Sequence, residues 1–147
     1  MKKHEPQQMT QSLEDYLEAI YILVMEDESA CVRDVAKKLD VKMPSVVKAI
    51  HELKKMELVT QEPYAKIELT EKGRRVAGVV LNRHTLLSRF LVKLGVSRRI
   101  AEKDACMMEH ILSAETLDRI RDFTGPETGE DALTKAGKPK KERKAKL

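Results

Sequence analysis

The chain has 147 residues, of which 41% are hydrophobic, 35% charged and 3% aromatic. This mixture fits one or two small soluble domains, and the scarcity of aromatic side chains excludes modules that stack single-stranded nucleic acid on rows of rings. The longest uninterrupted apolar run, 19–25, is far shorter than the roughly 18 residues that a membrane-spanning helix needs. The opening MKKHEPQQM lacks the apolar stretch and cleavage site of a signal peptide, so we expect a cytoplasmic protein.

The net charge of +4 conceals an uneven distribution along the chain. Residues 135–147 hold seven Lys or Arg and a single Glu, whereas residues 1–32 are net acidic and residues 33–75 net basic. Because phosphate contacts need local positive charge, the segment 33–75 is a candidate nucleic-acid surface, although ordinary solvated faces explain the same swing. The two cysteines, Cys31 and Cys106, are too few for a disulfide framework, which leaves one of them available as a ligand.

Helices dominate the predicted secondary structure. The first segment is predicted to be helical because it lacks Gly and Pro, starts at Ser12 as N-cap and carries acidic residues in its first turn. Pro44 suits the first turn of the third helix, Gly95 the end of the fourth, and Ser113 the N-cap of the last. The predicted ranges are 12–25, 33–39 and 44–56 for three helices, 58–61 and 66–69 for the strands of a hairpin, and 71–93, 98–112 and 114–124 for three further helices.

Residues 32–53 have the apolar pattern of a helix-turn-helix motif, in which two helices meet at a steep angle. The apolar positions at the expected offsets are Val35, Ala36, Leu39, Val41, Val46 and Ala49. Asp40 occupies the turn position and tolerates a left-handed backbone better than most residues. Because a hairpin follows directly, we predict a winged helix, although any well-packed unit of three helices can show this pattern.

Polar residues on the third predicted helix favour DNA binding. Side chains at its start and along its outer side would enter a major groove, and a lysine on the wing would contact a phosphate. The candidate DNA-binding residues are Lys42, Pro44, Ser45, Lys48 and Lys66, with His51 as a further candidate. The alternative is that these residues only solvate the surface.

Ligand-type side chains occur on three predicted helices. Asp15 and Glu18 share one face of the first helix, and the same face continues with Ile22 and Met25, so we expect the two carboxylates to point toward protein. His84 stands in an otherwise apolar row of the fourth helix, where an imidazole needs a partner. Taken singly, these features are explained by compensation of the helix dipole and by a hydrogen-bonded core histidine.

A third group, Cys106, Glu109 and His110, has the spacing i, i+3 and i+4. This spacing predicts a thiol, a carboxylate and an imidazole on one surface of the fifth helix. Buried carboxylates are costly without a compensating cation, and a divalent metal ion is a sufficient one. The coexistence of the three groups therefore indicates a metal site.

Five segments over residues 10–122 resemble, in order, the diphtheria toxin repressor and manganese transport regulator family of metal-activated repressors: SLEDYLEAIYIL, MPSVVKAIHEL, YAKIELTEKG, NRHTLLSRFL and ACMMEHILS. The resemblance implies a mainly α fold with a small β-hairpin wing, in which an N-terminal winged helix-turn-helix precedes a helical dimerisation domain. The expected domains are 1–72 for DNA binding, 73–124 for metal binding and dimerisation, and 125–147 as a disordered Lys-rich tail.

The resemblance also implies the metal ligands, because the family's ligand positions fall on Asp15, Glu18, His84, Cys106, Glu109 and His110. Asp15 is the manganese-type choice, whereas Cys106 is the iron-type one. Ser88 replaces the Glu of the iron-type ancillary site, so that site is not expected, although Glu102 could supply another oxygen. We favour Mn(II), with Fe(II) as the alternative; Zn(II) or Co(II) would bind tightly by intrinsic affinity. No residues remain for the third, SH3-like domain of the longer iron-type members, so we expect the shorter manganese-type architecture.

The ligands predict a mechanism, because Asp15 and Glu18 belong to the DNA-binding unit and the others to the dimerisation helices. Metal would tie the two parts together and select one spacing of the recognition helices, so that metal and operator DNA bind cooperatively. A twofold homodimer is expected, since a small two-domain chain needs a partner to bury its apolar faces. The apolar stripes include Val79, Val80, Leu86, Phe90, Ile100, Met107 and Ile111, some of which serve the core of the chain itself.

Two other classes of function compete with a metal-activated repressor. A winged-helix regulator that responds to an organic ligand would need an apolar pocket and would not need six ligand-type residues. A metal-dependent hydrolase could use the same carboxylates and imidazoles. Because the sequence has no Gly-rich phosphate loop, nucleophile elbow or triad spacing, we predict no catalytic residues and no enzyme activity. The basic tail would add salt-sensitive attraction to DNA or only aid solubility.

Overall fold

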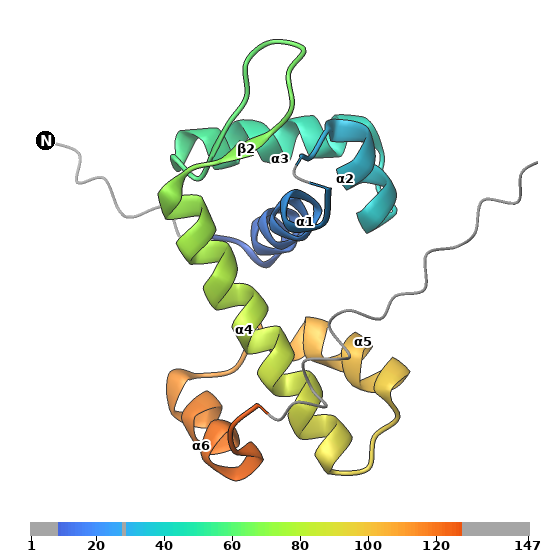
Figure 1. The fold of residues 1–147 in the computed structure, drawn as a ribbon, viewed down its shortest axis with the longest axis vertical. Helices are drawn as coiled ribbons and strands as arrows, with labels where there is room; N and C mark the ends of the chain where they lie inside the picture. Colours follow the sequence, from blue (N-terminus) through green and yellow to red (C-terminus); the bar gives the residue numbers. More distant parts are fainter. Residues whose placement is uncertain (1–8, 28, 128–147) are drawn as a thin grey trace, which may run out of the picture. The chain divides into compact units, whose positions relative to one another are not determined.

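The computed structural model describes residues 9–27 and 29–127, which form six helices and a two-stranded antiparallel hairpin (Figure 1). The chain divides into two compact units, 1–85 and 86–147, and the division falls inside α4. The elements are α1 (Gln11–Asp27), α2 (Val32–Leu39), α3 (Met43–Lys55), β1 (Val59–Thr60), β2 (Glu68–Leu69), α4 (Glu71–Lys93), α5 (Arg98–Met108) and α6 (Ala114–Thr124). The mainly helical fold with a small hairpin is the predicted one. Within the described ranges, no helix combines the length and the apolar character that crossing a lipid bilayer requires.

The first unit packs α1, α2, α3 and the hairpin around one apolar core. Val35, Ala36, Val46 and Ala49 are buried at the interface of α2 and α3, as the helix-turn-helix pattern predicts. Asp40 adopts the left-handed conformation, with φ of 53°, and so permits the sharp turn between these helices. Val41, the apolar turn residue, is 36% exposed, so the buried set is smaller than the predicted one.

Two details of α1 differ from the prediction. The helix begins at Gln11, and the hydroxyl of Thr10, not that of Ser12, accepts a hydrogen bond from the backbone N–H of Leu13 at 3.2 Å. Thr10 therefore satisfies one of the N–H groups that a helix start leaves unpaired. The face of Asp15 and Glu18 is half-buried, but it emerges into solvent at Met25, which is 63% exposed.

The hairpin is shorter than the two predicted runs. Val59 pairs with Leu69 and Thr60 with Glu68, whereas Ile67 bridges to Ala30, with its N–H donating to the Ala30 carbonyl at 2.8 Å. Beyond these pairs, a loop projects away from the helices of the unit and forms the wing (Figure 1).

The first turn of α4 is fixed to the end of α3 and the base of the wing. The Thr70 hydroxyl donates to the carbonyl of Glu57 at 2.6 Å and accepts from the N–H of Gly73 at 2.9 Å. Lys72 Nζ donates to the carbonyl of Met56 at 3.1 Å. From this start α4 runs over the predicted range 71–93.

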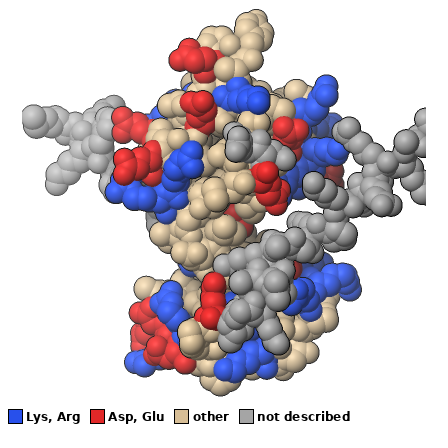
Figure 2. Space-filling view, viewed as in Figure 1, with Lys and Arg blue, Asp and Glu red and all other residues tan. Residues whose placement is uncertain are grey.

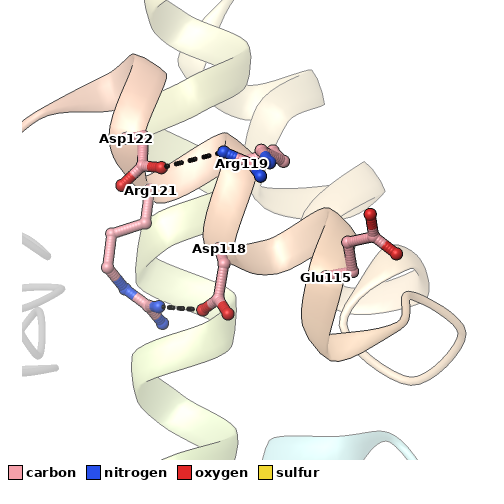
Figure 3. Close-up of a pocket in the computed structure, with 5 residues that line it drawn as sticks. All are labelled: Glu115, Asp118, Arg119, Arg121 and Asp122. Carbon is pink, nitrogen blue, oxygen red and sulfur yellow. Dashed lines mark hydrogen bonds and ion pairs between the residues drawn. The ribbon is translucent and has the colours of Figure 1, made fainter.

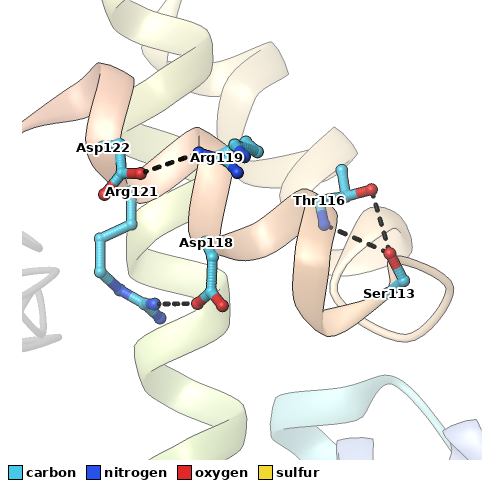
Figure 4. Close-up of polar contacts among 6 residues, drawn as sticks. All are labelled: Ser113, Thr116, Asp118, Arg119, Arg121 and Asp122. Carbon is cyan, nitrogen blue, oxygen red and sulfur yellow. Dashed lines mark hydrogen bonds and ion pairs between the residues drawn. The ribbon is translucent and has the colours of Figure 1, made fainter.

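The second unit consists of the end of α4, α5 and α6, with Leu86, Leu87, Ala105 and Leu117 as its buried cluster. Here α5 ends at Met108, four residues before the predicted end. The reason is the start of α6: Ser113 is extended, with φ of −70° and ψ of 159°, and its Oγ accepts from the N–H of Thr116 at 3.2 Å (Figure 4). A tight turn between the helices allows this capping.

Charged residues cover the exposed face of α6. Arg121 pairs with Asp118 at 2.7 Å and Arg119 with Asp122 at 3.8 Å. Together with Glu115 these residues line a surface hollow (Figure 3), but all of them are exposed, and none is a predicted ligand. Exposed ion pairs of this kind contribute little to stability. The predicted tail, 125–147, lies outside the described residues from position 128 onward.

Candidate metal centre and DNA-binding surface

Within the first unit, α1 and α4 supply three of the predicted ligands. Asp15 and Glu18 lie one turn apart on α1 and are half-buried, and His84 on α4 is 9% exposed. A carboxylate oxygen of Glu18 and a ring nitrogen of His84 lie within 4.8 Å of each other. In the apolar row that contains His84, Val80 and Leu87 are buried, whereas Val76 and Leu91 are half-buried.

Within the second unit, the end of α5 supplies a carboxylate and an imidazole. His110 Nε2 lies 3.2 Å from Glu109 Oε1, and the two side chains are 2% and 1% exposed. Glu109 is the C-cap of α5, where its N–H still donates to the carbonyl of Ala105 at 3.0 Å. Cys106 lies one turn earlier and is exposed, so the thiol does not share the burial of the other two groups.

This donor set fits a divalent cation. Burial of a carboxylate such as that of Glu109 is costly unless positive charge or hydrogen bonds compensate it. Carboxylate oxygens and imidazole nitrogens are the ligands that Mn(II) and Fe(II) take in proteins, and each unit holds one such oxygen and nitrogen close together.

Ser88 and Glu102 are connected to each other in the second unit. The Ser88 hydroxyl donates to Glu102 Oε1 at 2.7 Å; Ser88 is 7% exposed, whereas Glu102 lies at the surface. The oxygen that the sequence suggested as a further ligand thus accepts a hydrogen bond from a neighbouring helix.

The surface of α3 and the wing carries every candidate DNA-binding residue. Lys42 is the N-cap of α3, and Pro44 stands in its first turn, as predicted. All of the candidates are exposed: Lys42, Pro44, Ser45, Lys48, His51 and Lys66. Figure 2 shows that Lys and Arg are interspersed with acidic residues on the visible face of this unit, so the charge is mixed.

Sequence reasoning missed the exposed apolar side chains of the same surface. Met43 and Val47 on α3 are 49% and 56% exposed. Tyr64, in the loop of the wing, has a relative exposure of 108% and a φ of 61°. Periodicity identifies which residues are apolar but gives no signal for a left-handed tyrosine.

Comparison with known proteins decides the family. Residues 8–67 match the N-terminal DNA-binding domain of the iron-dependent repressors, and residues 70–128 match their metal-binding and dimerisation domain. The HTH-type transcriptional regulator MntR of Geobacillus kaustophilus is 42% identical over 114 residues, which are 78% of this chain and 81% of the relative. This chain belongs to the iron-dependent repressor family. A second relative, an HTH-type transcriptional regulator of Methanocaldococcus jannaschii, is 39% identical over 117 residues, which are 78% of this chain and 94% of the relative.

Solved structures agree with this assignment to the iron-dependent repressors. The crystal structure of T. acidophilum IdeR superposes on this chain with a TM-score of 0.71 at 27% sequence identity. The match covers 82% of this chain and 56% of the IdeR chain. The structure of the manganese regulator SloR superposes with a TM-score of 0.68 at 31% sequence identity, and the match covers 78% of this chain and 54% of the SloR chain. The chain thus spans about half the length of these structures. The predicted family, the fold class and the class of metal-dependent DNA-binding regulators are confirmed.

Proposed function

We propose that this iron-dependent repressor binds duplex operator DNA as a homodimer when Mn(II) or Fe(II) is bound, and that it controls genes of metal uptake or homeostasis. The observation that carries the proposal is the pairing of oxygen and nitrogen donors in each unit: Glu18 with His84, and Glu109 with His110. The matched DNA-binding and metal-binding domains support it.

The proposed ligands are Asp15, Glu18, His84, Cys106, Glu109 and His110. Asp15 and Glu18 belong to the matched DNA-binding domain, and the other four belong to the matched metal-binding and dimerisation domain. A bound divalent cation neutralises the charge of these carboxylates, which otherwise repel one another. Metal binding would then select the DNA-binding form of the dimer, so that metal and operator bind cooperatively.

Mn(II) is the favoured metal and Fe(II) the alternative. Carboxylates supply three of the six proposed ligands, and hard oxygen donors suit Mn(II). The related structure titled as a manganese-dependent transcriptional repressor in complex with manganese, 29% identical with a TM-score of 0.70, supports this choice. Cys106, as the soft donor of the set, is the residue that favours Fe(II).

The DNA contacts are assigned to α3 and the wing. Lys42, Ser45 and Lys48 would enter the major groove and Lys66 would contact a phosphate. Pro44, Met43 and Val47 add exposed apolar surface, which in a major groove meets the methyl groups of thymine.

The dimer is assigned to exposed apolar residues of the metal-binding domain. Val79, Met107 and Ile111 are 53%, 62% and 74% exposed, whereas Val80 and Leu86 belong to the core of the chain.

We place the boundary between the functional domains at residues 72–73, and the site of action in the cytoplasm, where duplex operator DNA lies. The basic segment 135–147 would add a weak, salt-dependent attraction to DNA.

The test is the capture of random genomic DNA fragments by the metal-stripped full chain under anaerobic conditions at fixed salt, with chelator, with Mn(II) and with Fe(II). Selective capture with one metal is expected and names the activator. His110→Ala is expected to remove the metal response and to leave the dimer intact. Equal capture in all three conditions would refute the metal switch, and the absence of any capture would refute DNA binding.

A further inference from the structure

Tyr64 presents its whole side chain to solvent. Its relative exposure of 108% is the highest among the exposed large hydrophobic residues of the described ranges. A tyrosine ring is a large, mostly apolar body with one polar tip, and leaving it in water forgoes the free energy that burial would supply. A polar residue would serve a loop that only connects two strands.

The backbone of Tyr64 adds a second cost. Its φ of 61° lies in the left-handed region, which bulky side chains disfavour and which glycine or asparagine occupies in ordinary turns. Strain of this kind persists in proteins where the surrounding structure holds it, and it concentrates at functional positions.

The loop around Tyr64 is held by hydrogen bonds to α3 and within itself. Gln61 Nε2 donates to the carbonyl of Ala65 at 2.9 Å, and the N–H of Ala65 donates to the carbonyl of Glu62 at 3.0 Å. Lys54 Nζ, at the end of α3, donates to the carbonyl of Gln61 at 3.1 Å. The ring therefore projects from a support that is attached to the proposed recognition helix.

We propose that Tyr64 is a DNA-contacting residue that packs its ring against the sugars of the operator minor groove beside the major groove occupied by α3. This inference rests on the proposed function. Strand β1 and the loop that carries Tyr64 lie within residues 8–67, which match a DNA-binding domain, and Lys66 is exposed two positions further on. Figure 2 shows uncharged atoms at the tip of the wing with acidic atoms beside them, an arrangement that suits a sugar surface better than a phosphate.

An uncharged contact has a distinctive energetic signature. Lys and Arg contacts release counterions, so their loss lowers the dependence of affinity on salt, whereas the loss of a neutral ring does not. Tyr64 should therefore contribute to operator affinity without contributing to the salt slope. Lys66, on the same wing, should contribute to that slope.

The test compares full-length wild type with Tyr64→Ala, Tyr64→Gly, Tyr64→Phe and, as matched control, Lys66→Gln, in Mn(II) at several salt concentrations. Tyr64→Ala and Tyr64→Gly are expected to lose about tenfold in operator affinity at an unchanged salt slope. Tyr64→Phe keeps most of the affinity, and Lys66→Gln lowers the slope by about one unit per phosphate contact. Hydroxyl-radical footprints of Tyr64→Ala should lose protection at minor-groove sugars next to the α3 site.

Folding does not confound this comparison. Tyr64→Gly removes an exposed side chain and relieves the left-handed backbone, so its thermal midpoint should equal or exceed that of wild type. Wild-type affinity and footprint in Tyr64→Ala would overturn the inference, as would an affinity loss accompanied by a reduced salt slope. A wild type that binds operator equally with chelator would overturn only the metal switch, because the variants still report on Tyr64; a wild type that binds no duplex would overturn both.

Discussion

Gly73 shows how one residue without a side chain joins α4 to the DNA-binding unit. A Cβ at this position would overlap the carbonyl oxygen of Leu58, which the backbone N–H of Thr70 also contacts at 3.1 Å. The close approach allows Thr70 and Lys72 to bond the carbonyls at the end of α3. The first turn of α4 is thereby fixed to the segment that follows α3.

Substitution of Gly73 should therefore reverse the usual benefit of alanine in a helix. Gly73→Ala is expected to lower the free energy of unfolding by about 1–3 kcal/mol, because the methyl group must displace backbone. Gly78→Ala, in the same helix, meets nothing within 4 Å and is expected to raise stability by about 0.5–1 kcal/mol. Urea unfolding of both variants measures the difference. Equal effects of the two substitutions would contradict the packing argument.

At the scale of elements, α6 is attached to α4 through its last turn. Phe123 contacts Phe90 edge to face, with centroids 5.8 Å apart, and Lys93 Nζ lies 5.0 Å from the Phe123 ring. Arg89 donates to the carbonyls of Gly125 and Pro126 at 3.1 and 2.8 Å. These contacts hold the end of α6, whereas the ion pairs on its exposed face (Figure 4) stand in solvent.

The two kinds of contact on α6 should differ in their effect on stability. Phe123→Ala is expected to cost about 1–2 kcal/mol, because it removes an aromatic pair and a cation–π contact together. Asp118→Asn is expected to change the free energy of unfolding by about 0.5 kcal/mol or less, since its partner Arg121 is exposed. Thermal unfolding checks both. A larger loss for Asp118→Asn than for Phe123→Ala would refute this ranking.

The elements that could be predicted from sequence are those with local signals at both ends. Thr70 and Gly95 mark the ends of α4, and Gly95 has a φ of 100°. The end of α5 carried no such signal, because Glu109–Leu112 are compatible with a helix and only the capping by Ser113 ends it earlier. Likewise, residue types and spacing identified the candidate ligands, but the exposure of Cys106 depends on tertiary packing.

At the scale of the whole molecule, dimerisation should depend on apolar side chains that are exposed to solvent in the single chain. Ile111→Lys is expected to shift the protein toward monomer and to weaken operator binding, because a buried unpaired charge is costly in a dimer interface. Met25→Lys is the matched control, since Met25 is 63% exposed but lies on α1, outside the proposed interface. Sedimentation at several concentrations measures the change. A dimer of unchanged stability in Ile111→Lys would move the interface to another face.

Metal activation of the whole molecule should weaken in acid, because protons and the metal compete for the same side chains. The proposed ligands coordinate only after the carboxylates and the imidazoles of His84 and His110 lose their protons. The Mn(II) concentration for half-maximal operator binding is therefore expected to rise several-fold between about pH 7.5 and about pH 5.5, the range in which imidazoles commonly titrate. Operator affinity at saturating Mn(II) provides the control, since it separates metal binding from direct effects of pH on DNA contacts. A metal requirement that stays constant over this range would exclude the two imidazoles as ligands.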